Sequence, residues 1–365
     1  MGRRRPVNLR RGLKMVIYVA STGPYAGKTL TLLGLGKALE GKDIRFLKTL
    51  GNRPLARNGV LLDEDALVVA EALALEQEKS SLCGIVLTQD LLVEALKGGS
   101  LPTKETILRQ AQTLEKEGEV LLASGFGTLY SGKFLGASNL ELALALEAKV
   151  VLVARFEGEF VIDYLLQARQ DLGERLKAVV INAIEEEARP LYEELVRPFL
   201  QKEGFEILAE IPRDNLLQAV SVSELRDFLA ARVLVAGRED RLIERFLIGG
   251  MQVDKAVTYF KKTPNFGVIV GGDRSDIQLA AIETGAVCLI LTGGLYPNEI
   301  ILAKAEEHEV AVLVVPDDTY STAQKVERLP LVTRLRHPSK LKRAFEITER
   351  FFRHEILDRL LGSER

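Results

Sequence analysis

The sequence predicts an α/β protein in which a doubly wound parallel sheet, carrying a phosphate-binding loop, is followed by a second, smaller α/β domain. Three observations lead to this prediction. An apolar strand over residues 16–20 runs through a loop of small residues into a helix that starts at Lys28 and Thr29. Strands and helices then alternate up to Pro212, which in parallel sheets implies right-handed crossovers. The alternation restarts at Phe266 and passes through three further strands.

The loop between this strand and this helix has the residue types that hold phosphate groups. Glycines let the backbone approach the phosphates, Lys28 neutralises their oxygens, and the Thr29 hydroxyl suits Mg²⁺. The strict spacing G-x-x-x-x-G-K-[ST] is missed, because Thr22 stands where the first glycine belongs and a glycine follows it. The competing interpretation is an ordinary strand–turn–helix corner. The predicted cofactor-binding residues of the loop are Gly23, Ala26, Gly27, Lys28 and Thr29.

Composition limits the function classes. The chain has 365 residues, 47% of them hydrophobic and 27% charged, with a formal net charge of −2. These values indicate a two-domain globular protein and argue against general nucleic-acid binding. No apolar run reaches the ~18 residues of a membrane span. Cys83 and Cys288 lie far apart in apolar stretches, and the three histidines do not cluster. We therefore expect a cytoplasmic protein with reduced cysteines and no Cys or His metal site.

The residues at the ends of the next strands are candidates for ligand contacts, because loops at the carboxyl edge of a parallel sheet carry them. Lys48 ends the strand over 43–49, and is either a substrate or phosphate contact or a solvated lysine. The loop over 51–61 leads to three acidic residues, 63–65, before a helix. Acidic residues at that position cap a helix, and they also suit Mg²⁺.

Two later strand ends carry informative side chains. Ser124 follows the strand over 118–123, where a working NTPase normally offers a carboxylate to its metal ion. Asn182 follows the strand over 177–181. Its amide can read an adenine edge, and it can equally cap the turn that leaves the strand.

The second unit is expected to begin at Asp214, with helices over 241–247 and 253–261 before the alternation restarts. In a parallel sheet its three successive strand ends lie side by side, so their loops form one cleft. Such a cleft suits an anion or a nucleotide, and a subunit interface is the competing interpretation. The residues of this predicted cleft are Gly271, Gly272, Asp273, Arg274, Thr292, Gly293, Gly294 and Asp317.

With these motifs in place, residues 15–328 resemble a known domain pair. The first unit resembles the P-loop domain of dethiobiotin synthetase and of the cobyrinate diamide synthases. The second resembles the DRTGG domain, on the signatures Gly271–Ile277 and Leu291–Gly294. The pair occurs upstream of the catalytic domain in long bacterial phosphotransacetylases and also as a stand-alone protein. The resemblance implies a P-loop domain over 15–213 and a DRTGG domain over 214–328. The basic residues before Met15 predict a disordered tail, 1–14, with a nucleic-acid or membrane-binding arm as the alternative. The apolar spacing within 329–365 predicts a C-terminal amphipathic helix.

The resemblance also implies ligands and roles. ATP with Mg²⁺ is the implied cofactor; Thr29 and Asp65 hold the metal ion, and Asn182 reads the adenine. Lys28 and Lys48 are the catalytic residues if the protein is an enzyme. Ser124 replaces the glutamate of the family, and a lost carboxylate weakens divalent binding.

Two functions follow from this resemblance. One is a regulatory or sensor protein that binds a nucleotide with weak or no hydrolysis, while the DRTGG domain binds a small molecule or mediates assembly into a homo-oligomer. The other is an ATP-dependent ligase that activates a carboxylate. The acetyl-transfer domain is missing from this sequence, so we expect no phosphotransacetylase activity from the chain alone.

Overall fold

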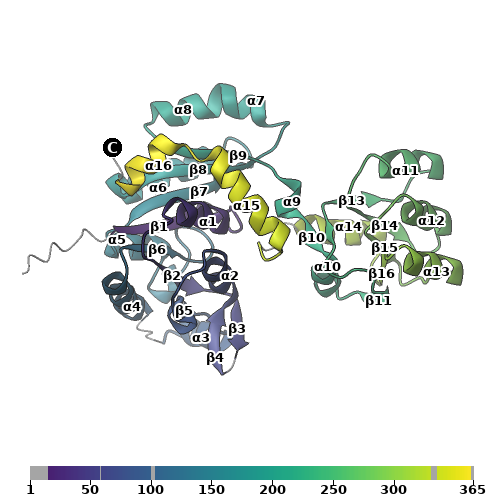
Figure 1. Cartoon of the computed structure of the whole chain (residues 1–365), viewed down its shortest axis with the longest axis horizontal. Helices are drawn as coiled ribbons and strands as arrows, with labels where there is room; N and C mark the ends of the chain where they lie inside the picture. The colour runs from purple at the N-terminus through teal and green to yellow at the C-terminus, as the bar shows by residue number, and fades with distance from the viewer. Residues whose placement is uncertain (1–14, 58, 100–102, 330–334, 363–365) are drawn as a thin grey trace, which may run out of the picture. The chain divides into compact units, whose positions relative to one another are not determined.

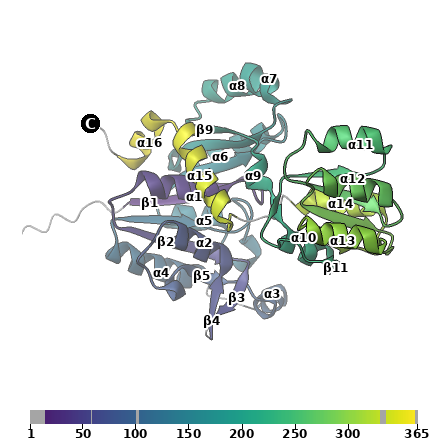
Figure 2. The same cartoon turned by 45° about the vertical axis from the view of Figure 1, so that its right-hand side comes forward.

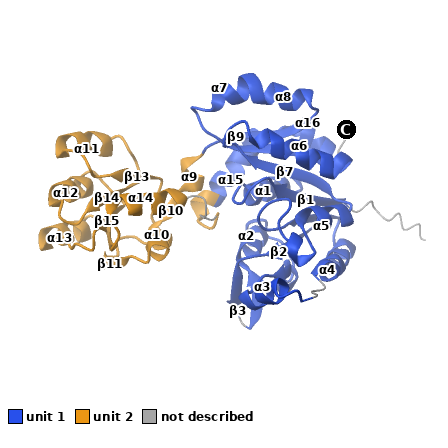
Figure 3. Cartoon of the chain, turned by 180° about the vertical axis from the view of Figure 1, so that it is seen from behind, with its two compact units in different colours: residues 1–213, 341–365 blue, residues 214–340 orange. Residues whose placement is uncertain are grey.

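The structure is a computed structural model, and it describes residues 15–57, 59–99, 103–329 and 335–362. The predicted basic tail, residues 1–14, lies outside the described residues. The chain divides into two compact units (Figure 3): residues 1–213 with 341–365, and residues 214–340. The second unit is therefore inserted into the sequence of the first.

The first unit is built on a seven-stranded sheet whose neighbouring strands all pair in parallel, in the order β5-β2-β6-β1-β7-β8-β9. The strands are short apolar runs, as expected for a sheet that is covered on both faces. They are β1 Met15–Ser21, β2 Ile44–Gly51, β5 Cys83–Val86, β6 Val120–Ser124, β7 Lys149–Arg155, β8 Leu176–Ile184 and β9 Ile207–Pro212.

Helices connect these strands, and the predicted α/β alternation is confirmed. Leu114, Leu142 and Leu165, from α4, α5 and α6, share one hydrophobic core with the sheet. α1 contacts β1 and β6 of the sheet and also α2. The helices are α1 Lys28–Ala38, α2 Glu64–Ala72, α3 Gln89–Leu96, α4 Thr103–Glu117, α5 Asn139–Ala145, α6 Val161–Leu172, α7 Arg189–Leu191 and α8 Arg197–Lys202.

The segment predicted as a loop over 51–61 instead contains a β-hairpin, formed by β3 Pro54–Arg57 and β4 Val60–Asp63. Asp63 fixes both of its ends. One carboxylate oxygen accepts the Arg53 N–H at 3.0 Å, and the other accepts the Ala66 N–H at 3.0 Å and caps α2. The prediction missed the hairpin because the Pro and Gly residues of this segment are typical of loops.

The C-terminal residues form two helices where one was predicted: α15 Pro338–Phe351 and α16 His354–Leu361. The break has a local cause. Arg353 has an extended backbone, its N–H donates to the Leu208 carbonyl in β9 at 2.8 Å, and its guanidinium pairs with Glu210. Figures 1 and 2 show α15 next to α1, and the β8–β9 side of the sheet next to α16.

The contact between α1 and α15 is close. A side chain at Gly34 would lie 2.7 Å from Thr348 and 2.8 Å from Phe352. Both of these residues are buried. The C-terminal helices therefore complete the first unit rather than standing apart from it.

The second unit is built on a five-stranded sheet in the order β11-β16-β15-β14-β13. β13 to β16 pair in parallel, and β11 is antiparallel to β16. The strands of this unit are β10 Val220–Ser221, β11 Arg232–Val235, β12 Leu242–Ile243, β13 Arg245–Ile248, β14 Phe266–Gly271, β15 Cys288–Thr292 and β16 Ala311–Val314.

Residues 241–247, predicted as a helix, form strands instead. β12 pairs with β10, and β13 pairs with β14, where Leu247 lies opposite Val268. Partners on β10 and β14 decide the structure of this segment, because the local sequence is compatible with either state. The prediction of a helix was wrong for this reason.

Helices cover both faces of the second sheet. Along β14, Val268 and Val270 belong to one core with α11, α12 and α13, while Ile269 belongs to another with α10 and α14. The helices are α9 Asn215–Gln218, α10 Val222–Leu229, α11 Val253–Phe260, α12 Ser275–Glu283, α13 Glu299–Glu307 and α14 Thr319–Arg328. In the part of the chain that the structure describes, no helix has both the length and the apolarity needed to cross a bilayer.

Candidate functional site

The predicted phosphate loop lies between β1 and α1, as the sequence indicated. Gly27 is the residue before the helix and has φ 114°, a conformation that favours glycine. A side chain there would run into the Asn182 amide. That amide donates to the Ala26 carbonyl at 2.8 Å and so supports the loop. The loop backbone and the start of α1 form a cradle, and a helix N-terminus of this kind favours an anion such as phosphate.

Lys28 is the first residue of α1, and its ammonium group lies inside this cradle. It donates to the Ser21 hydroxyl at 2.8 Å and to the Gly127 carbonyl at 2.6 Å. Burial, with a smaller contribution from Lys48, lowers the pKa of Lys28 to about 7, although Asp65 acts in the opposite direction. A phosphate oxygen is a stronger acceptor than a carbonyl. The Lys28 ammonium is therefore placed to give up its hydrogen bond to the Gly127 carbonyl and to donate to a phosphate oxygen instead.

Lys48 lies on the neighbouring strand β2 and is buried against two carboxylates. Its Nζ is 2.8 Å from Asp63 Oδ1 and 3.0 Å from Asp65 Oδ2. Burial acts to lower the pKa of Lys48, but the two carboxylates outweigh it and the net shift is upward. Lys48 is therefore a fixed cation beside the loop, not a solvated lysine at a strand end.

Mg²⁺ was predicted to bind at Thr29 and Asp65. Thr29 is half-buried in the first turn of α1. The Asp65 carboxylate, however, is shared between Lys48 and Arg53, whose Nε lies 3.5 Å away. Among the described residues, no three His, Cys, Asp or Glu side chains are grouped so that they could hold a metal ion. Asp65 is therefore already engaged by two cations, and Mg²⁺ binding through Thr29 and Asp65 stays a prediction.

The cleft predicted in the second unit lies at the carboxyl edge of its parallel strands, but its donors are already engaged. The Gly293 N–H donates to the Asp317 carbonyl at 2.8 Å, and the Gly294 N–H to the Val315 carbonyl at 2.9 Å. The Arg274 guanidinium forms two bonds, of 2.9 and 3.0 Å, to the Asp276 carboxylate. These two hydrogen bonds from Arg274 lower the pKa of Asp276.

The other predicted residues of this edge are placed similarly. The Gly272 N–H donates to the Thr292 carbonyl at 3.4 Å, and the Thr292 hydroxyl lies 2.8 Å from that of Thr319. The Asp317 carboxylate pairs with Lys325 at 2.7 Å. The Gly271 carbonyl accepts a hydrogen bond from the Gln278 side-chain amide at 2.9 Å. Large apolar and aromatic side chains are exposed in the adjoining loops and helix starts: Leu295, Tyr296, Ile300 and Tyr320.

Comparison with known proteins agrees with this division. An AAA domain family matches residues 15–221, and the DRTGG domain matches residues 224–329. The chain belongs to the AAA domain family. Its first unit is a P-loop domain of the dethiobiotin synthetase type and its second is a DRTGG domain, which confirms the predicted pairing.

The curated relatives that match are longer proteins. A phosphate acetyltransferase from Pseudomonas aeruginosa is 27% identical over 342 residues, which cover 86% of this chain and 47% of the relative. A phosphate acetyltransferase from Pseudomonas putida is 28% identical over 245 residues, covering 62% of this chain and 35% of the relative. The chain thus spans less than half the length of either enzyme.

Part of the chain also matches a different class of protein. A cobalt-dependent inorganic pyrophosphatase from Clostridium perfringens is 26% identical over 124 residues, covering 32% of this chain and 20% of the relative. One solved structure that matches contains the CBS and DRTGG domains of the regulatory region of C. perfringens pyrophosphatase, complexed with the activator diadenosine tetraphosphate. The match covers 37% of this chain and 69% of the chain in that structure, with 18% sequence identity and a TM-score of 0.29.

Several residues of the P-loop domain site were not predicted. Tyr18 in β1 is buried, and its hydroxyl lies 2.8 Å from the Thr49 hydroxyl and 2.8 Å from the Asn139 carbonyl oxygen. The Asn139 amide donates to the carbonyls of Phe126 and Thr128, at 2.8 and 2.6 Å. This network fixes the loop that presents the Gly127 carbonyl to Lys28. The sequence did contain one signal for this network, a tyrosine within an otherwise aliphatic strand.

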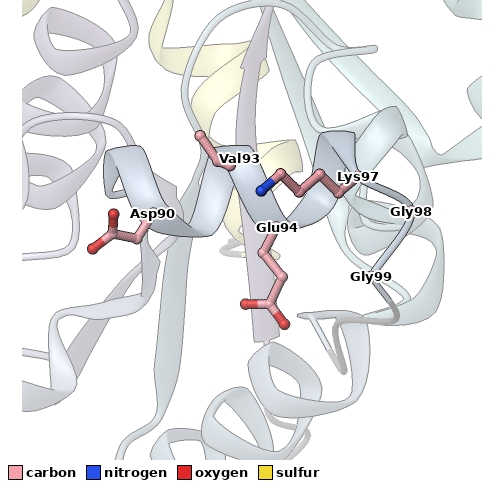
Figure 4. Close-up of a pocket in the computed structure, with 6 residues that line it drawn as sticks. All are labelled: Asp90, Val93, Glu94, Lys97, Gly98 and Gly99. Carbon is pink, nitrogen blue, oxygen red and sulfur yellow. The ribbon is translucent and has the colours of Figure 1, made fainter.

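A hollow of about 480 Å³ lies elsewhere on the P-loop domain, along α3 and the turn that follows it (Figure 4). Figure 4 shows the carboxylates of Asp90 and Glu94 and the ammonium of Lys97 pointing in different directions. These side chains do not converge on a common point, so the hollow is not a second candidate site.

Proposed function

We propose that the P-loop domain binds ATP or a related nucleotide through its phosphates, and that the chain is a regulatory nucleotide-binding protein with weak or no hydrolysis. The observation that carries the proposal is the buried ammonium of Lys28 at the start of α1, held by a serine hydroxyl and a main-chain carbonyl. Thr29 and the backbone of residues 23–28 would hold the phosphates, and Asn182 would lie toward the base.

Removing the Lys28 ammonium tests the proposal. Lys28→Ala should weaken nucleotide binding at least tenfold, about 1.4 kcal/mol, in isothermal titration calorimetry. Lys37→Ala is the matched control, because Lys37 lies on the same helix but is exposed and paired with Glu40 at 2.6 Å. Equal affinities of wild type and Lys28→Ala would refute the assignment of the loop.

The proposal of weak hydrolysis rests on Ser124. This residue is 3% exposed and lies beside Lys48 in the paired strands β6 and β2, where the family pattern places a metal-binding glutamate. Without that carboxylate, less charge is available to position a metal ion at the transferred phosphoryl group. Wild-type turnover should stay well below the ~1 s⁻¹ low end for working enzymes.

A steady-state phosphate-release assay, run with and without Mg²⁺, tests this point. Ser124→Glu should raise Mg²⁺-dependent nucleotide binding and hydrolysis. Ser124→Gln introduces a side chain of nearly the same shape as glutamate but without its charge. It should raise neither nucleotide binding nor hydrolysis. If both variants respond alike, the effect comes from packing in the buried strand and not from a restored metal ligand.

A ligase is the second candidate, and one observation favours it. Lys48 is held rigidly by Asp63 and Asp65 beside the loop, as a residue that positions a second substrate would be. Rapid wild-type hydrolysis that increases on addition of a small carboxylic acid would replace the regulatory proposal with this one. In that case Lys28 and Lys48 would be the catalytic residues.

For the DRTGG domain we propose assembly into a cytoplasmic homo-oligomer, with binding of a small molecule as the alternative. The N–H groups of Gly272, Gly293 and Gly294 at the carboxyl edge donate to main-chain carbonyls. Tyr296 and Tyr320 are 53% and 71% exposed there. Exposed aromatic residues are typical of protein interfaces. Sedimentation of the wild type and of Tyr320→Ser tests the proposal, since a monomeric wild type would exclude it. Phosphotransacetylase activity of the chain alone is not part of the proposed function.

A further inference from the structure

Arg53 lies between β2 and the β3–β4 hairpin, and one of its donors lacks a partner. Its side chain is 14% exposed. Its Nη1 atom is buried and has no hydrogen-bond partner among the described residues. A buried donor without a partner costs free energy, more so when it belongs to a charged group. Such a group in a native protein calls for a specific explanation.

The carboxylates near Arg53 do not provide that explanation. Its Nε lies 3.5 Å from Asp65 Oδ2, and the same oxygen accepts a 3.0 Å contact from Lys48 Nζ. Asp63 contacts Lys48 at 2.8 Å and gives its other oxygen to the Arg53 main-chain N–H. The guanidinium therefore shares the Asp65 carboxylate with Lys48. Lys28, which interacts electrostatically with the same Asp65, adds a further cation when it is protonated.

The guanidinium also lies next to the phosphate loop. Arg53 Cζ is 5.7 Å from the centre of the Tyr25 ring, close enough for a cation–π contact. Tyr25 is three residues before Lys28, 46% exposed, and has φ 55°. A non-glycine residue in this conformation is strained, and such residues concentrate at ligand-binding segments. Tyr25 is thus an exposed residue of the loop whose ring lies against the Arg53 guanidinium.

We propose that Arg53 is an oxyanion-binding residue of the P-loop site: its Nη1 donates to a phosphate or carboxylate oxygen bound beside the loop. The inference rests on the proposed nucleotide binding and extends it. The planar guanidinium is suited to this role, because it presents parallel donors to two oxygens of one anion. The oxyanion is either the terminal phosphate of the nucleotide or the carboxylate of a second ligand.

Isothermal titration calorimetry with ATP and ADP separates these two sources. If Arg53 binds the terminal phosphate, Arg53→Gln should weaken ATP binding about tenfold and ADP binding much less. If it binds a carboxylate, the ATP-to-ADP affinity ratio should stay unchanged, and the variant should lose the acetate binding that wild type shows in the presence of saturating ADP. Arg57→Gln is the matched control, because Arg57 lies in the same hairpin and is exposed.

The remaining outcomes decide against the inference. If Arg53→Gln changes neither the nucleotide ratio nor acetate binding, the missing partner is a buried water and Arg53 is structural. Arg53→Lys, which keeps the charge but lacks the fork, serves if the glutamine variant unfolds, and it should show an intermediate loss. Loss of binding in Lys28→Ala with full binding in both Arg53 variants would overturn this inference alone. A wild type that binds no nucleotide would overturn the proposed function with it.

Discussion

At the carboxyl edge of the P-loop sheet, Lys28 is held by a hydroxyl and a carbonyl, and Arg53 retains a buried donor without a partner. At the corresponding edge of the DRTGG sheet, Arg274 forms a fork on Asp276, and the loop glycines donate to backbone carbonyls. Both edges have the parallel strands, glycines and cations that a ligand cleft needs. Among the described residues, the first edge retains a buried donor that an added anion would satisfy, whereas the loop N–H groups of the second edge already have acceptors.

This difference teaches that the geometry of a sheet edge is not sufficient to define a site. A strand end with glycine and arginine is compatible with anion binding and also with a self-contained loop. The distinction depends on whether each donor already has an acceptor of its own. Three experiments test this comparison, beginning with the largest expected effect.

Gly27→Ala should have the largest effect. At φ 114° the new side chain would be strained and would also run into the Asn182 amide. We expect the P-loop domain to lose about 2–3 kcal/mol of stability and its nucleotide binding. Gly294→Ala in the DRTGG domain is the matched change, with φ 66° and no atom within 4 Å. It should cost about 1 kcal/mol. Differential scanning calorimetry measures both, and equal losses would remove the special role of Gly27.

The titration of Lys28 should give the next effect. With a pKa of about 7, Lys28 is mostly protonated at pH 6 and mostly neutral at pH 8. A bound phosphate favours the protonated form, so nucleotide affinity should fall about tenfold from pH 6 to pH 8. Lys28→Arg stays charged throughout this range. The ratio of wild-type to Lys28→Arg affinity isolates the lysine, because titration of the phosphate is common to both. A constant ratio would contradict the lowered pKa.

Arg274→Gln should have the smallest effect. The Arg274–Asp276 pair is substantially exposed, and such pairs contribute within about 0.5 kcal/mol. We expect an almost unchanged melting temperature of the DRTGG domain and unchanged nucleotide affinity. A strong loss of nucleotide binding in this variant would show that the DRTGG edge is part of the nucleotide site, and would reverse the comparison.

The sequence was sufficient to predict what is local. The strand–loop–helix order around Lys28 is written in consecutive residues, and so is the alternation of strands and helices in both domains. Lys48 and Asp65 were picked out by their places at a strand end and a helix start. Their direct contact was not predicted, because it requires the turn of the β3–β4 hairpin.

What the sequence did not predict depends on residues far apart in the chain. The Gly127 carbonyl is an acceptor for Lys28 only because Tyr18 and Asn139 fix its loop. The segment 241–247 became two strands because their partners come from elsewhere in the domain. The role proposed for Arg53 rests on the burial of its Nη1 atom. The sequence alone does not show which side-chain atoms are buried.

The close packing of Gly34 against Thr348 and Phe352 has a consequence for synthesis on the ribosome. α1 is made early, whereas the helices that cover it follow the whole DRTGG domain. At roughly 5–20 residues per second, translation of residues 214–352 takes on the order of ten seconds. During that interval the outer side of α1 stays uncovered in the nascent chain. A chain stalled at residue 340 should therefore be cleaved by protease near α1, and the released full chain should resist; equal resistance would contradict this order of completion.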